Sequence, residues 1–296
     1  MDQDARFPDL PGVEHSFVEL PDGLRMHVAA AGQGDPVLLL HGFPQHWWEW
    51  RGVIPTLAEH HRVIVPDLRG TGWTDAPKTG YERDQLLADV VALLDALEVD
   101  RVHVIAHDWS SLISYFLCFE HPERVRSYLC LAIPHPYIRF DVRALPTIRH
   151  LWFQYVNATP GLGPWLLRSG RQRLLRRIIR GFSSPRTTWS EDDLEIFTSR
   201  MREPARARAA SRLYRGLILT ELVRIAGGRY RDRRLTTPTV ILAGSDDPVM
   251  RVELLGGYED HADDLTIKSV ADASHFIADE QPDAVVAHAL ELIART

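Results

Sequence analysis

Short apolar runs alternate with segments of helical period along most of the chain. Six runs are strand-like, namely Val37–His41, Val63–Asp67, Val102–Ala106, Ser127–Ile133, Thr239–Gly244 and Leu265–Val270. Between and after them, apolar residues recur every three or four positions in RDQLLADVVALLDALEV and DAVVAHALELIART, which predicts two amphipathic helices. Apolar strands separated by helices predict an α/β fold in which a mostly parallel sheet is covered by helices on both faces.

Two other stretches depart from this alternation. HSFVELPDGLRMHVAAAG predicts an antiparallel hairpin, because Asp22-Gly23 is a strong turn signal between two partly alternating segments. From Pro136 to Arg234 the strand-like runs vanish, and tryptophan, arginine and helix-period segments dominate. We therefore expect a core made of residues 1–135 and 235–296, with a helical cap of residues 136–234 inserted between two strands.

The cap contains an arginine-rich segment, RSGRQRLLRRIIRG, with six arginines between Arg168 and Arg180. Such a segment is found on anion-binding or membrane-binding surfaces. Acidic residues elsewhere in the cap dilute any basic field, which favours a solvated helix face. We expect four apolar residues of the segment to pack inward, namely Leu174, Leu175, Ile178 and Ile179.

Composition and charge narrow the function classes. The chain has 296 residues, is 25% charged and carries a net charge of −6, and the absence of a basic excess argues against a nucleic-acid partner. No apolar run approaches the roughly 20 residues that span a bilayer, and Asp2, Gln3 and Asp4 after Met1 do not resemble a signal peptide. Two cysteines are too few for a disulfide framework, so a cytoplasmic location is expected. The oligomeric state stays open.

The segment VIAHDWSS places an acidic residue where an apolar run ends and a helical segment begins. Its acid, Asp108, has the small residues Ala106 and Ser110 two positions away on either side. A tight strand-to-helix turn that projects its central side chain above a sheet requires small flanking residues. The pattern predicts a nucleophile elbow at Asp108, because a tip at Ser110 would crowd the turn with Asp108 and Leu112. The alternative is an aspartate that only caps the following helix.

Two later strand ends supply the partners that a carboxylate nucleophile needs. SDDP, with Asp246 and Asp247, follows one predicted strand, and ADASHF, with His275, follows the next. In open α/β sheets, active groups collect at the carboxyl ends of strands. The chain order of nucleophile, acid and base therefore predicts a triad of Asp108, one of the two aspartates, and His275.

Hydrolysis of an ester on the nucleophile also needs N–H groups that face the developing oxyanion. LLLHGFPQHWWEW follows the first predicted parallel strand and supplies such a loop. Gly42 allows a close backbone approach, and the amide of Phe43 is expected to point inward. The amide of Trp109 is the second expected donor of this oxyanion hole.

Five motifs, HGFPQHWWEW, DLRGTGWTD, AHDWS, LAGSDDP and ASHF, together resemble the α/β-hydrolase superfamily. Within it, the chain is similar to the epoxide hydrolases and to their relatives the haloalkane dehalogenases. The resemblance runs from about Val13 to the C-terminus and is weakest across the cap. It implies an α/β-hydrolase fold with Asp108 as nucleophile, His275 as base and Asp247 as acid, because the family's acid directly precedes a proline-containing turn. Relatives usually have glycine where this chain has Ala106 and Ser110.

An aspartate nucleophile suits attack on a saturated carbon. The carboxylate forms an alkyl ester on the enzyme, and water activated by His275 then attacks the carbonyl of Asp108. A serine ether formed in the same way could not be hydrolysed. We therefore expect a cofactor-free enzyme that adds water to the epoxide of a small apolar organic molecule and releases a vicinal diol.

The leaving group separates the two subfamilies. An opening epoxide needs a proton donor such as a phenol, whereas a halide needs only N–H donors. Epoxide hydrolases that this chain resembles commonly place two tyrosines in the cap, and SRLYRGL matches the second of them, at Tyr214. LWFQYV aligns Phe153 with the first, and Tyr155 is an alternative. The expected substrate pocket consists of Phe43, Trp109, Trp152, Phe153 and Tyr155.

Haloalkane dehalogenation is the alternative activity, with Trp109 and either Trp152 or Trp165 as halide donors. Against it, the loop reads HGFP, where many dehalogenases carry an asparagine after the glycine. A ligand-binding protein without catalysis is a third class. Because such proteins usually lack part of the triad, the complete triad in this chain favours an enzyme.

Two further clusters invite other interpretations. Trp47, Trp48 and Trp50 either wall a substrate pocket or seat the helix that follows them. Five histidines suggest a metal site, but no HExxH motif or carboxylate-rich ligand spacing accompanies them, so no metal is expected. These histidines are His41, His46, His60, His61 and His107.

Overall fold

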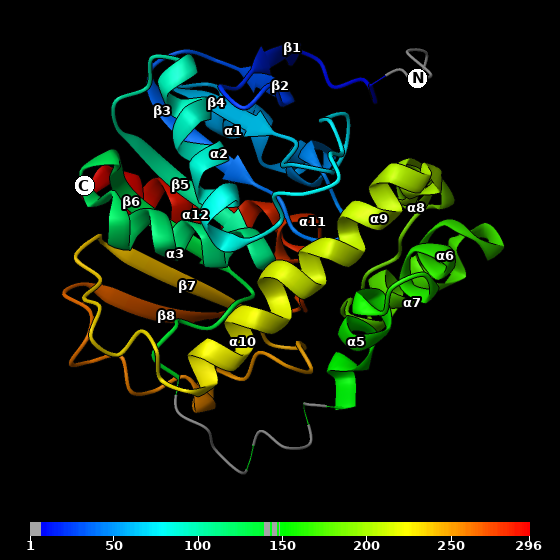
Figure 1. The fold of residues 1–296 in the computed structure, drawn as a ribbon. Helices are drawn as coiled ribbons and strands as arrows, with labels where there is room; N and C mark the ends of the chain where they lie inside the picture. Colours follow the sequence, from blue (N-terminus) through cyan, green and yellow to red (C-terminus); the bar gives the residue numbers. More distant parts are fainter. Residues whose placement is uncertain (1–6, 139–142, 144–146, 148) are drawn as a thin grey trace.

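The computed structural model describes residues 7–138, 143, 147 and 149–296, and an eight-stranded sheet forms the centre of this part of the chain (Figure 1). The strand order is β1-β2-β4-β3-β5-β6-β7-β8. β1 and β2 form the predicted hairpin and pair antiparallel, β2 pairs antiparallel with β4, and the remaining pairs are parallel. The predicted mostly parallel sheet is therefore confirmed. The strands are β1 (Glu14–Glu19), β2 (Arg25–Ala31), β3 (Asp35–Leu40), β4 (His61–Pro66), β5 (Val102–His107), β6 (Val125–Leu131), β7 (Thr239–Gly244) and β8 (Leu265–Val270).

Helices cover both faces of the sheet (Figure 1). Alternate side chains of the central strands pack against the helices on opposite faces. Leu38 and Val104 face the cluster that contains α2 (Arg83–Ala96) and α3 (Trp109–Glu120). Leu39 and Ile105 face the second cluster, with the turn η1 (Trp47–Gly52), α1 (Ile54–Leu57) and α12 (Pro282–Ala294). The short helix α11 (Ile277–Glu280) precedes α12. Both faces of the central strands are thus buried, which explains why these strands are apolar throughout.

Two tryptophans of the HGFPQHWWEW motif pack against the face of the sheet that α12 covers. Trp47 and Trp50 have no exposed surface and belong to the cluster around α12. Neither lines the cavity described below. The interpretation that these residues seat the following helix is therefore the correct one for Trp47 and Trp50.

The described part of the chain between β6 and β7, where a helical cap is expected, contains helices and no strand of the sheet, and we call it the insertion. Its helices pack together on one side of the sheet (Figure 1) and are α5 (Trp152–Ala158), α6 (Leu162–Arg168), α7 (Arg173–Gly181), α8 (Glu191–Ser199), α9 (Pro204–Leu213) and α10 (Leu219–Ala226). On α7, Leu175 and Ile179 have no exposed surface, while Arg176 pairs with Glu191 and Glu195 of α8. The arginine-rich segment is thus a solvated, ion-paired face over an apolar one, as predicted.

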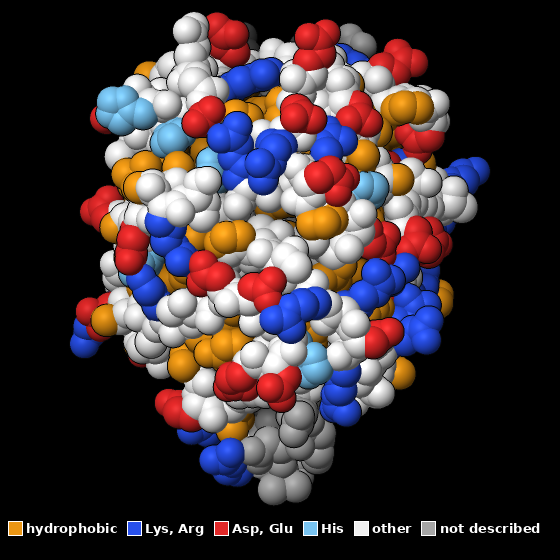
Figure 2. All heavy atoms as spheres, turned by 90° about the vertical axis from the view of Figure 1, so that its left-hand side faces the viewer, with side chains coloured by type: hydrophobic (Ala, Val, Ile, Leu, Met, Phe, Trp, Pro, Cys, Tyr) orange, Lys and Arg blue, Asp and Glu red, His pale blue; other side chains and the backbone are white. Residues whose placement is uncertain are grey.

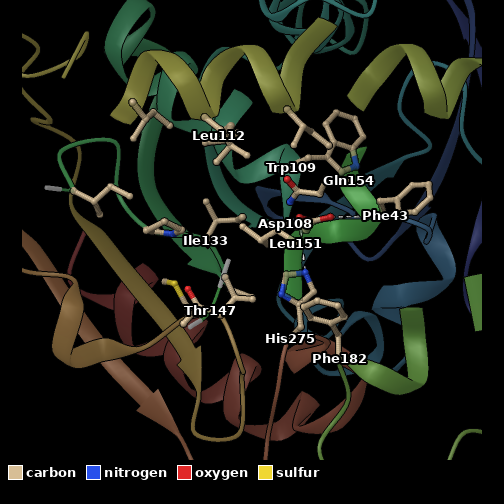
Figure 3. A pocket seen from close by; sticks show the side chains of 18 of the residues that line it. Phe43, Asp108, Trp109, Leu112, Ile133, Thr147, Leu151, Gln154, Phe182 and His275 are labelled. Atoms are coloured by element: carbon tan, nitrogen blue, oxygen red, sulfur yellow. Dashed lines mark hydrogen bonds and ion pairs between the residues drawn. The ribbon is translucent and has the colours of Figure 1, made fainter. Parts of the chain in front are cut away.

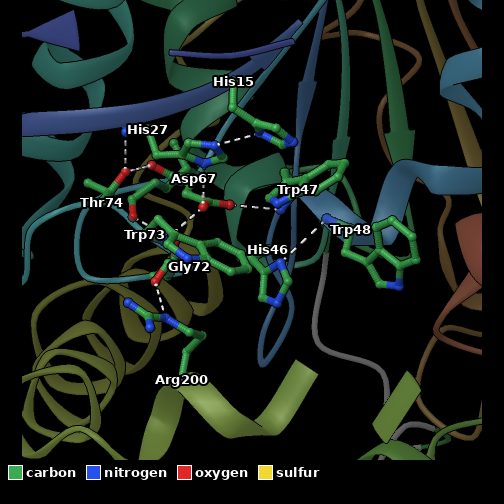
Figure 4. A network of polar contacts seen from close by, with 12 residues as sticks. His15, His27, His46, Trp47, Trp48, Asp67, Gly72, Trp73, Thr74 and Arg200 are labelled. Atoms are coloured by element: carbon green, nitrogen blue, oxygen red, sulfur yellow. Dashed lines mark hydrogen bonds and ion pairs between the residues drawn. The ribbon is translucent and has the colours of Figure 1, made fainter. Parts of the chain in front are cut away.

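Arginines of the insertion hold it against the core. The Arg206 guanidinium is buried and donates from Nη1 to the carbonyl oxygens of Thr71, at 3.0 Å, and Thr74, at 2.6 Å. Arg200 donates from Nε to the carbonyl oxygen of Gly72 at 3.0 Å (Figure 4). All three acceptors lie in the DLRGTGWTD motif, so this loop is the attachment point of the insertion.

The same loop is organised around the buried carboxylate of Asp67 (Figure 4). This carboxylate accepts the backbone N–H groups of Trp47 and Trp73, each at 2.8 Å, and forms an ion pair of 2.7 Å with His27. Burial alone raises the pKa of a carboxyl group, but His27 and the other nearby histidines hold the pKa of Asp67 well below its ordinary value. Asp67 therefore stays ionised and ties the attachment loop to β2 and η1.

The described part of the chain has no helix long and apolar enough to cross a membrane. Figure 2 shows one face of the molecule, on which acidic and basic side chains are interspersed. That face offers no continuous basic surface of the kind that tracks a phosphate backbone.

We expect Arg206→Met to lower the free energy of unfolding by about 3 kcal/mol, because two buried carbonyl oxygens lose a charged donor. Urea titration followed by circular dichroism measures this change. Arg208→Met is the matched control, since Arg208 is an exposed arginine of the same helix. Equal effects of the two substitutions would show that the contacts of Arg206 do not stabilise the fold.

Candidate active site

The predicted elbow is present at the end of β5. Asp108 has φ 54° and ψ −133°, and α3 begins at the next residue. A non-glycine residue in this region costs roughly 1–3 kcal/mol, so surrounding contacts must hold it. Ser110 provides two of these contacts, because its Oγ donates to the carbonyl oxygens of Leu40 and His107 at 2.8 Å each. Gly42 approaches so closely that a Cβ there would lie 2.7 Å from the Asp108 Cβ.

The structure brings Asp108, His275 and Asp247 together from three strand ends. The His275 Nε2 lies 3.7 Å from Oδ1 of Asp108, and its Nδ1 lies within hydrogen-bond distance, 3.3 Å, of Oδ2 of Asp247. The Asp108 and His275 side chains keep 19% and 16% of their surface exposed, so both are accessible to a small molecule. The Asp247 side chain is fully buried.

Of the two neighbouring aspartates, only Asp247 meets the imidazole. Its Oδ1 accepts the backbone N–H groups of Val249, at 2.7 Å, and Met250, at 3.0 Å, which fixes the carboxylate in place. Asp246 is exposed and instead accepts a hydrogen bond of 2.6 Å from Ser184 Oγ in the insertion. The geometry thus agrees with the family pattern, which favoured Asp247 over Asp246.

The charged groups of this site stabilise one another in their ionised forms. Burial lowers the pKa of an imidazole, but Asp108 and Asp247 outweigh burial and raise the pKa of His275 to about 10. Burial likewise acts to raise the pKa of Asp108, while His275, His107 and the Phe43 N–H together lower it. The resting site therefore holds an imidazolium between two carboxylates.

The two predicted oxyanion-hole residues flank the nucleophile. The Phe43 backbone N–H donates to Oδ2 of Asp108 at 3.0 Å (Figure 3). Trp109 is the first residue of α3, and the first four N–H groups of a helix have no partner within it. One of the two predicted donors thus contacts the Asp108 carboxylate, and the helix leaves the Trp109 amide without a partner of its own.

A cavity of about 300 Å³ opens above Asp108 between the strand ends and the insertion (Figure 3). Its walls are mostly apolar. Polar side chains that line it include those of Asp108, Gln154, Tyr214 and His275, so the reactive groups face a largely apolar space. Such a cavity suits a small organic molecule with one polar centre.

Tyr214 projects into this cavity from a turn of π-helix, η7 (Tyr214–Ile218), between α9 and α10. Single π turns often occur at functional sites. The ring is 2% exposed, and its centroid lies 5.1 Å from that of Phe43. Burial and the nearby charge of Asp108 raise the pKa of Tyr214 well above its ordinary value. The Tyr214 phenol is therefore protonated at neutral pH, and only a base stronger than the Tyr214 phenolate would take its proton.

The helical phase of α5 decides which of its predicted residues reach the cavity. Phe153 lines the cavity, whereas the side chains of Trp152 and Tyr155 are 45% and 62% exposed and do not. Positions 152 and 155 lie on the helix face away from position 153, because successive residues turn by about 100°. Trp165 is 57% exposed and also lies outside. The pocket prediction thus needs correction for Trp152 and Tyr155, and Tyr155 does not replace the missing phenol.

Sequence reasoning missed most of the insertion residues that line the cavity, among them Phe182 and Gln154. Phe182 lines the cavity, its carbonyl oxygen accepts the backbone N–H of His275 at 3.0 Å, and the two rings are 5.9 Å apart. Phe182 follows a cap helix without any motif, so no sequence signal singles it out. Gln154 also lines the cavity. Its position next to Phe153 in the segment matched to the family was the available signal.

Two of the histidines that suggested a metal site make other contacts. His41 Nε2 accepts the Leu68 N–H at 3.1 Å, and His46 Nε2 lies 3.1 Å from the carbonyl oxygen of Ile196 in the insertion. Within the described residues, no group of three or more histidine, cysteine, aspartate or glutamate side chains is placed to hold a metal ion.

Comparison with known proteins yields a consistent set of similarities. A family model described as the alpha/beta hydrolase fold matches residues 35–282. The soluble epoxide hydrolase of Corynebacterium sp. (strain C12) is 29% identical over 279 residues, which cover 92% of this chain and 95% of that protein. Epoxide hydrolase 2 of Siraitia grosvenorii is 32% identical over 219 residues, which cover 64% of this chain and 69% of that protein.

Solved structures show the same similarity in three dimensions. Epoxide hydrolase CorEH without ligand superposes with a TM-score of 0.82 at 28% identity, covering 96% of this chain and 99% of that one. Wild-type Cfl2 from Burkholderia cenocepacia superposes with a TM-score of 0.84 at 26% identity, covering 96% and 97%. The predicted fold class is confirmed over nearly the whole chain.

We expect Asp247→Asn to lower the pKa of His275 from about 10, because one of the two carboxylates that stabilise the imidazolium is removed. In the variant, His275 loses its proton at a lower pH. An NMR titration of the imidazole measures the change. Asp246→Asn is the matched control and should leave this pKa near its wild-type value; equal shifts in both variants would contradict the assignment of Asp247.

Proposed function

Because this chain belongs to the α/β-hydrolase fold family, we propose that it is an epoxide hydrolase that adds water to a small apolar epoxide and needs no cofactor. The observation that carries this proposal is a carboxylate at the elbow, Asp108, opening into an apolar cavity with the Tyr214 phenol on its wall. The names of the similar proteins support the same activity. Epoxide opening uses both groups, because it needs a nucleophile and a proton donor at once.

In the first step, an oxygen of Asp108 attacks one epoxide carbon. A new C–O bond forms to the carboxylate, and the ring C–O bond breaks with its electron pair on the ring oxygen. Tyr214 gives its proton to this oxygen and becomes a phenolate. The product is an alkyl ester on Asp108, and the negative charge of the carboxylate is lost.

Loss of that charge prepares His275 for the second step. With only Asp247 beside it, the imidazolium is less stable, so its pKa falls. The proton that His275 releases restores the Tyr214 phenol. Neutral His275 can then accept a proton from water as that water attacks the Asp108 carbonyl carbon.

The tetrahedral intermediate places negative charge on an Asp108 oxygen. The Phe43 amide, which donates to Oδ2 in the resting site, and the Trp109 amide are the proposed oxyanion donors. Collapse of the intermediate re-forms the Asp108 carbonyl and breaks the ester C–O bond, with the electron pair on the alkoxide oxygen. This oxygen takes the proton of the hydroxyl group that water added to Asp108, which releases the diol and leaves the Asp108 carboxylate. His275 keeps the proton that it took from water, and Tyr214 is already a phenol, so all three groups are back in their resting states.

Haloalkane dehalogenation is the second candidate, and one observation supports it. The Trp109 indole N–H is buried without a hydrogen-bond partner in the described structure, and Trp109 lines the cavity. A halide needs such donors, but Trp152 and Trp165 both lie outside the cavity, so a second indole is missing. A purely ligand-binding role fits the site less well, because a binding function does not require three assembled triad members.

The proposal also includes a division into domains and a cellular location. We keep the division into a core of residues 1–135 and 235–296 and a cap of residues 136–234, because the insertion closes the cavity over the nucleophile. We also propose a cytoplasmic location, since Cys118 and Cys130 are buried free thiols and burial raises the pKa of Cys118 to about 12. Thiols of this kind pack as small apolar groups and form no disulfide framework.

We expect His275→Gln to accumulate the ester, because Asp108 can still be alkylated while water is no longer activated. Mass spectrometry after incubation with styrene oxide should show the mass of the substrate added to the peptide that contains Asp108. Asp108→Asn is the control and should show no adduct. An adduct on another residue would overturn the assignment of the nucleophile.

We expect Tyr214→Phe to lower kcat/KM for styrene oxide by about 10²-fold, because the opening ring loses its proton donor. The same substitution should change bromide release from a 1-bromoalkane by less than about threefold, since a halide leaves without a proton. Tyr155→Phe is the matched control, and its exposed phenol predicts no change. A wild-type protein that releases bromide but forms no diol would favour the dehalogenase instead.

A further inference from the structure

A buried carboxylate lies beneath the triad and outside the mechanism described above. Glu49 belongs to η1 and is about as deeply buried as the core, with 1% of its surface exposed. Its Oε2 accepts the backbone N–H of Gly42 at 2.9 Å, in the residue before the oxyanion-hole amide of Phe43. Its Oε1 lies 2.8 Å from Nδ1 of His107, the residue before the nucleophile.

His107 extends this contact to the catalytic base. Its side chain has no exposed surface, and Nε2 lies 2.8 Å from the backbone carbonyl oxygen of His275. A carbonyl oxygen can only accept, so Nε2 carries a hydrogen. The Nδ1 contact with Glu49 is an ion pair rather than an aligned hydrogen bond, because neither atom meets hydrogen-bond geometry. One carboxylate and one imidazole thus join the loops of the oxyanion hole, the nucleophile and the base.

The close packing around His107 makes this link rigid. A Cβ on Gly42 would lie 2.6 Å from the His107 Nδ1, so the oxyanion loop rests directly on the ring. The His107 and His275 rings are 5.0 Å apart. A shift of the His107 ring would therefore displace the neighbouring amides as well as the base.

We propose that Glu49 and His107 form a positioning pair that holds a buried positive charge beside Asp108 and thereby accelerates hydrolysis of the ester. This inference rests on the proposed epoxide hydrolysis and deepens it. Neither residue touches the substrate in this scheme, since neither lines the cavity.

The charge state of the pair follows from its surroundings. Burial acts to lower the pKa of His107, but the Glu49 carboxylate outweighs it and raises the pKa above the ordinary value. The other carboxylate near Glu49, Asp279, pairs with Arg51, and burial raises its pKa to about 7. Both ring nitrogens of His107 face oxygen atoms, since Nδ1 lies beside the Glu49 carboxylate and Nε2 beside the His275 carbonyl oxygen, which is the arrangement that suits a doubly protonated ring. His107 also lowers the pKa of Asp108.

The positive charge affects the two chemical steps differently. During alkylation the Asp108 carboxylate loses its negative charge, so a nearby imidazolium gives the transition state no advantage over the free enzyme. During hydrolysis negative charge returns to an Asp108 oxygen, and a fixed cation in a buried site stabilises it. Removal of the charge should therefore slow the second step selectively.

The test is Glu49→Gln, which keeps the shape of the side chain. The glutamine carbonyl can still accept the Gly42 N–H, and a neutral His107 with its hydrogen on Nε2 can still donate to His275. With styrene oxide we expect kcat to fall roughly tenfold, because hydrolysis loses electrostatic stabilisation. KM should fall by a similar factor, so that kcat/KM, which reports alkylation, stays within about threefold of wild type. The fraction of enzyme that carries the Asp108 ester at steady state, measured by rapid-quench mass spectrometry, should rise.

Glu221→Gln is the matched control, because Glu221 is a fully buried glutamate of α10 that pairs with Arg224 away from the triad. Its kinetics should match wild type. KM does not depend on how much protein is folded, and misfolded protein would lower the ester fraction rather than raise it, so partial misfolding of the Glu49 variant would not imitate the expected result. Equal falls in kcat and kcat/KM, or an unchanged ester fraction, would overturn the inference.

A double variant tests whether the two residues act as a pair. Glu49→Gln combined with His107→Gln should slow hydrolysis no more than about threefold beyond Glu49→Gln alone, because both substitutions remove the same charge. Fully additive effects would refute the pair. If wild-type enzyme forms no ester on Asp108, the proposed function itself fails, and that result is distinct from a normal wild type with an unaffected Glu49 variant.

Discussion

The imidazolium of His275 between the carboxylates of Asp108 and Asp247 is the interaction on which the site depends. Each carboxylate raises the pKa of the imidazole, and the imidazole in turn keeps both carboxylates ionised. This mutual stabilisation keeps the nucleophile charged in a cavity whose walls are mostly apolar. It also makes the base sensitive to the state of the nucleophile, because esterification of Asp108 removes one of the two charges. In the proposed reaction, the same site would thus act first as a nucleophile and then as a general base.

The sheet explains why these three groups meet. Asp108, Asp247 and His275 follow β5, β7 and β8, whose carboxyl ends lie at one edge of a parallel sheet. Apolar runs that stop at a polar residue are visible in the sequence, so the fold, the elbow and the base were predictable. The choice between Asp246 and Asp247 was predictable only through the family pattern, because the two residues are adjacent and differ in which way their side chains point.

Other parts of the site depend on details that periodicity does not resolve. On α5 a difference of one or two positions separates Phe153, which lines the cavity, from Trp152 and Tyr155, which face outward. α5 has only 7 residues, about two turns, which is too short a pattern for its phase to be predicted at that accuracy. The contacts of Glu49 are tertiary: the carboxylate reaches His107, 58 positions along the chain, and only the folded sheet brings the two together.

The contacts between the insertion and the loop of the base have a further consequence. The Phe182 carbonyl oxygen accepts the N–H of His275, and Ser184 donates to Asp246, next to the acid of the triad. A displacement of the insertion would therefore pull on the segment that carries the imidazole. The fit of the insertion over the sheet and the orientation of the His275 ring are thus mechanically coupled.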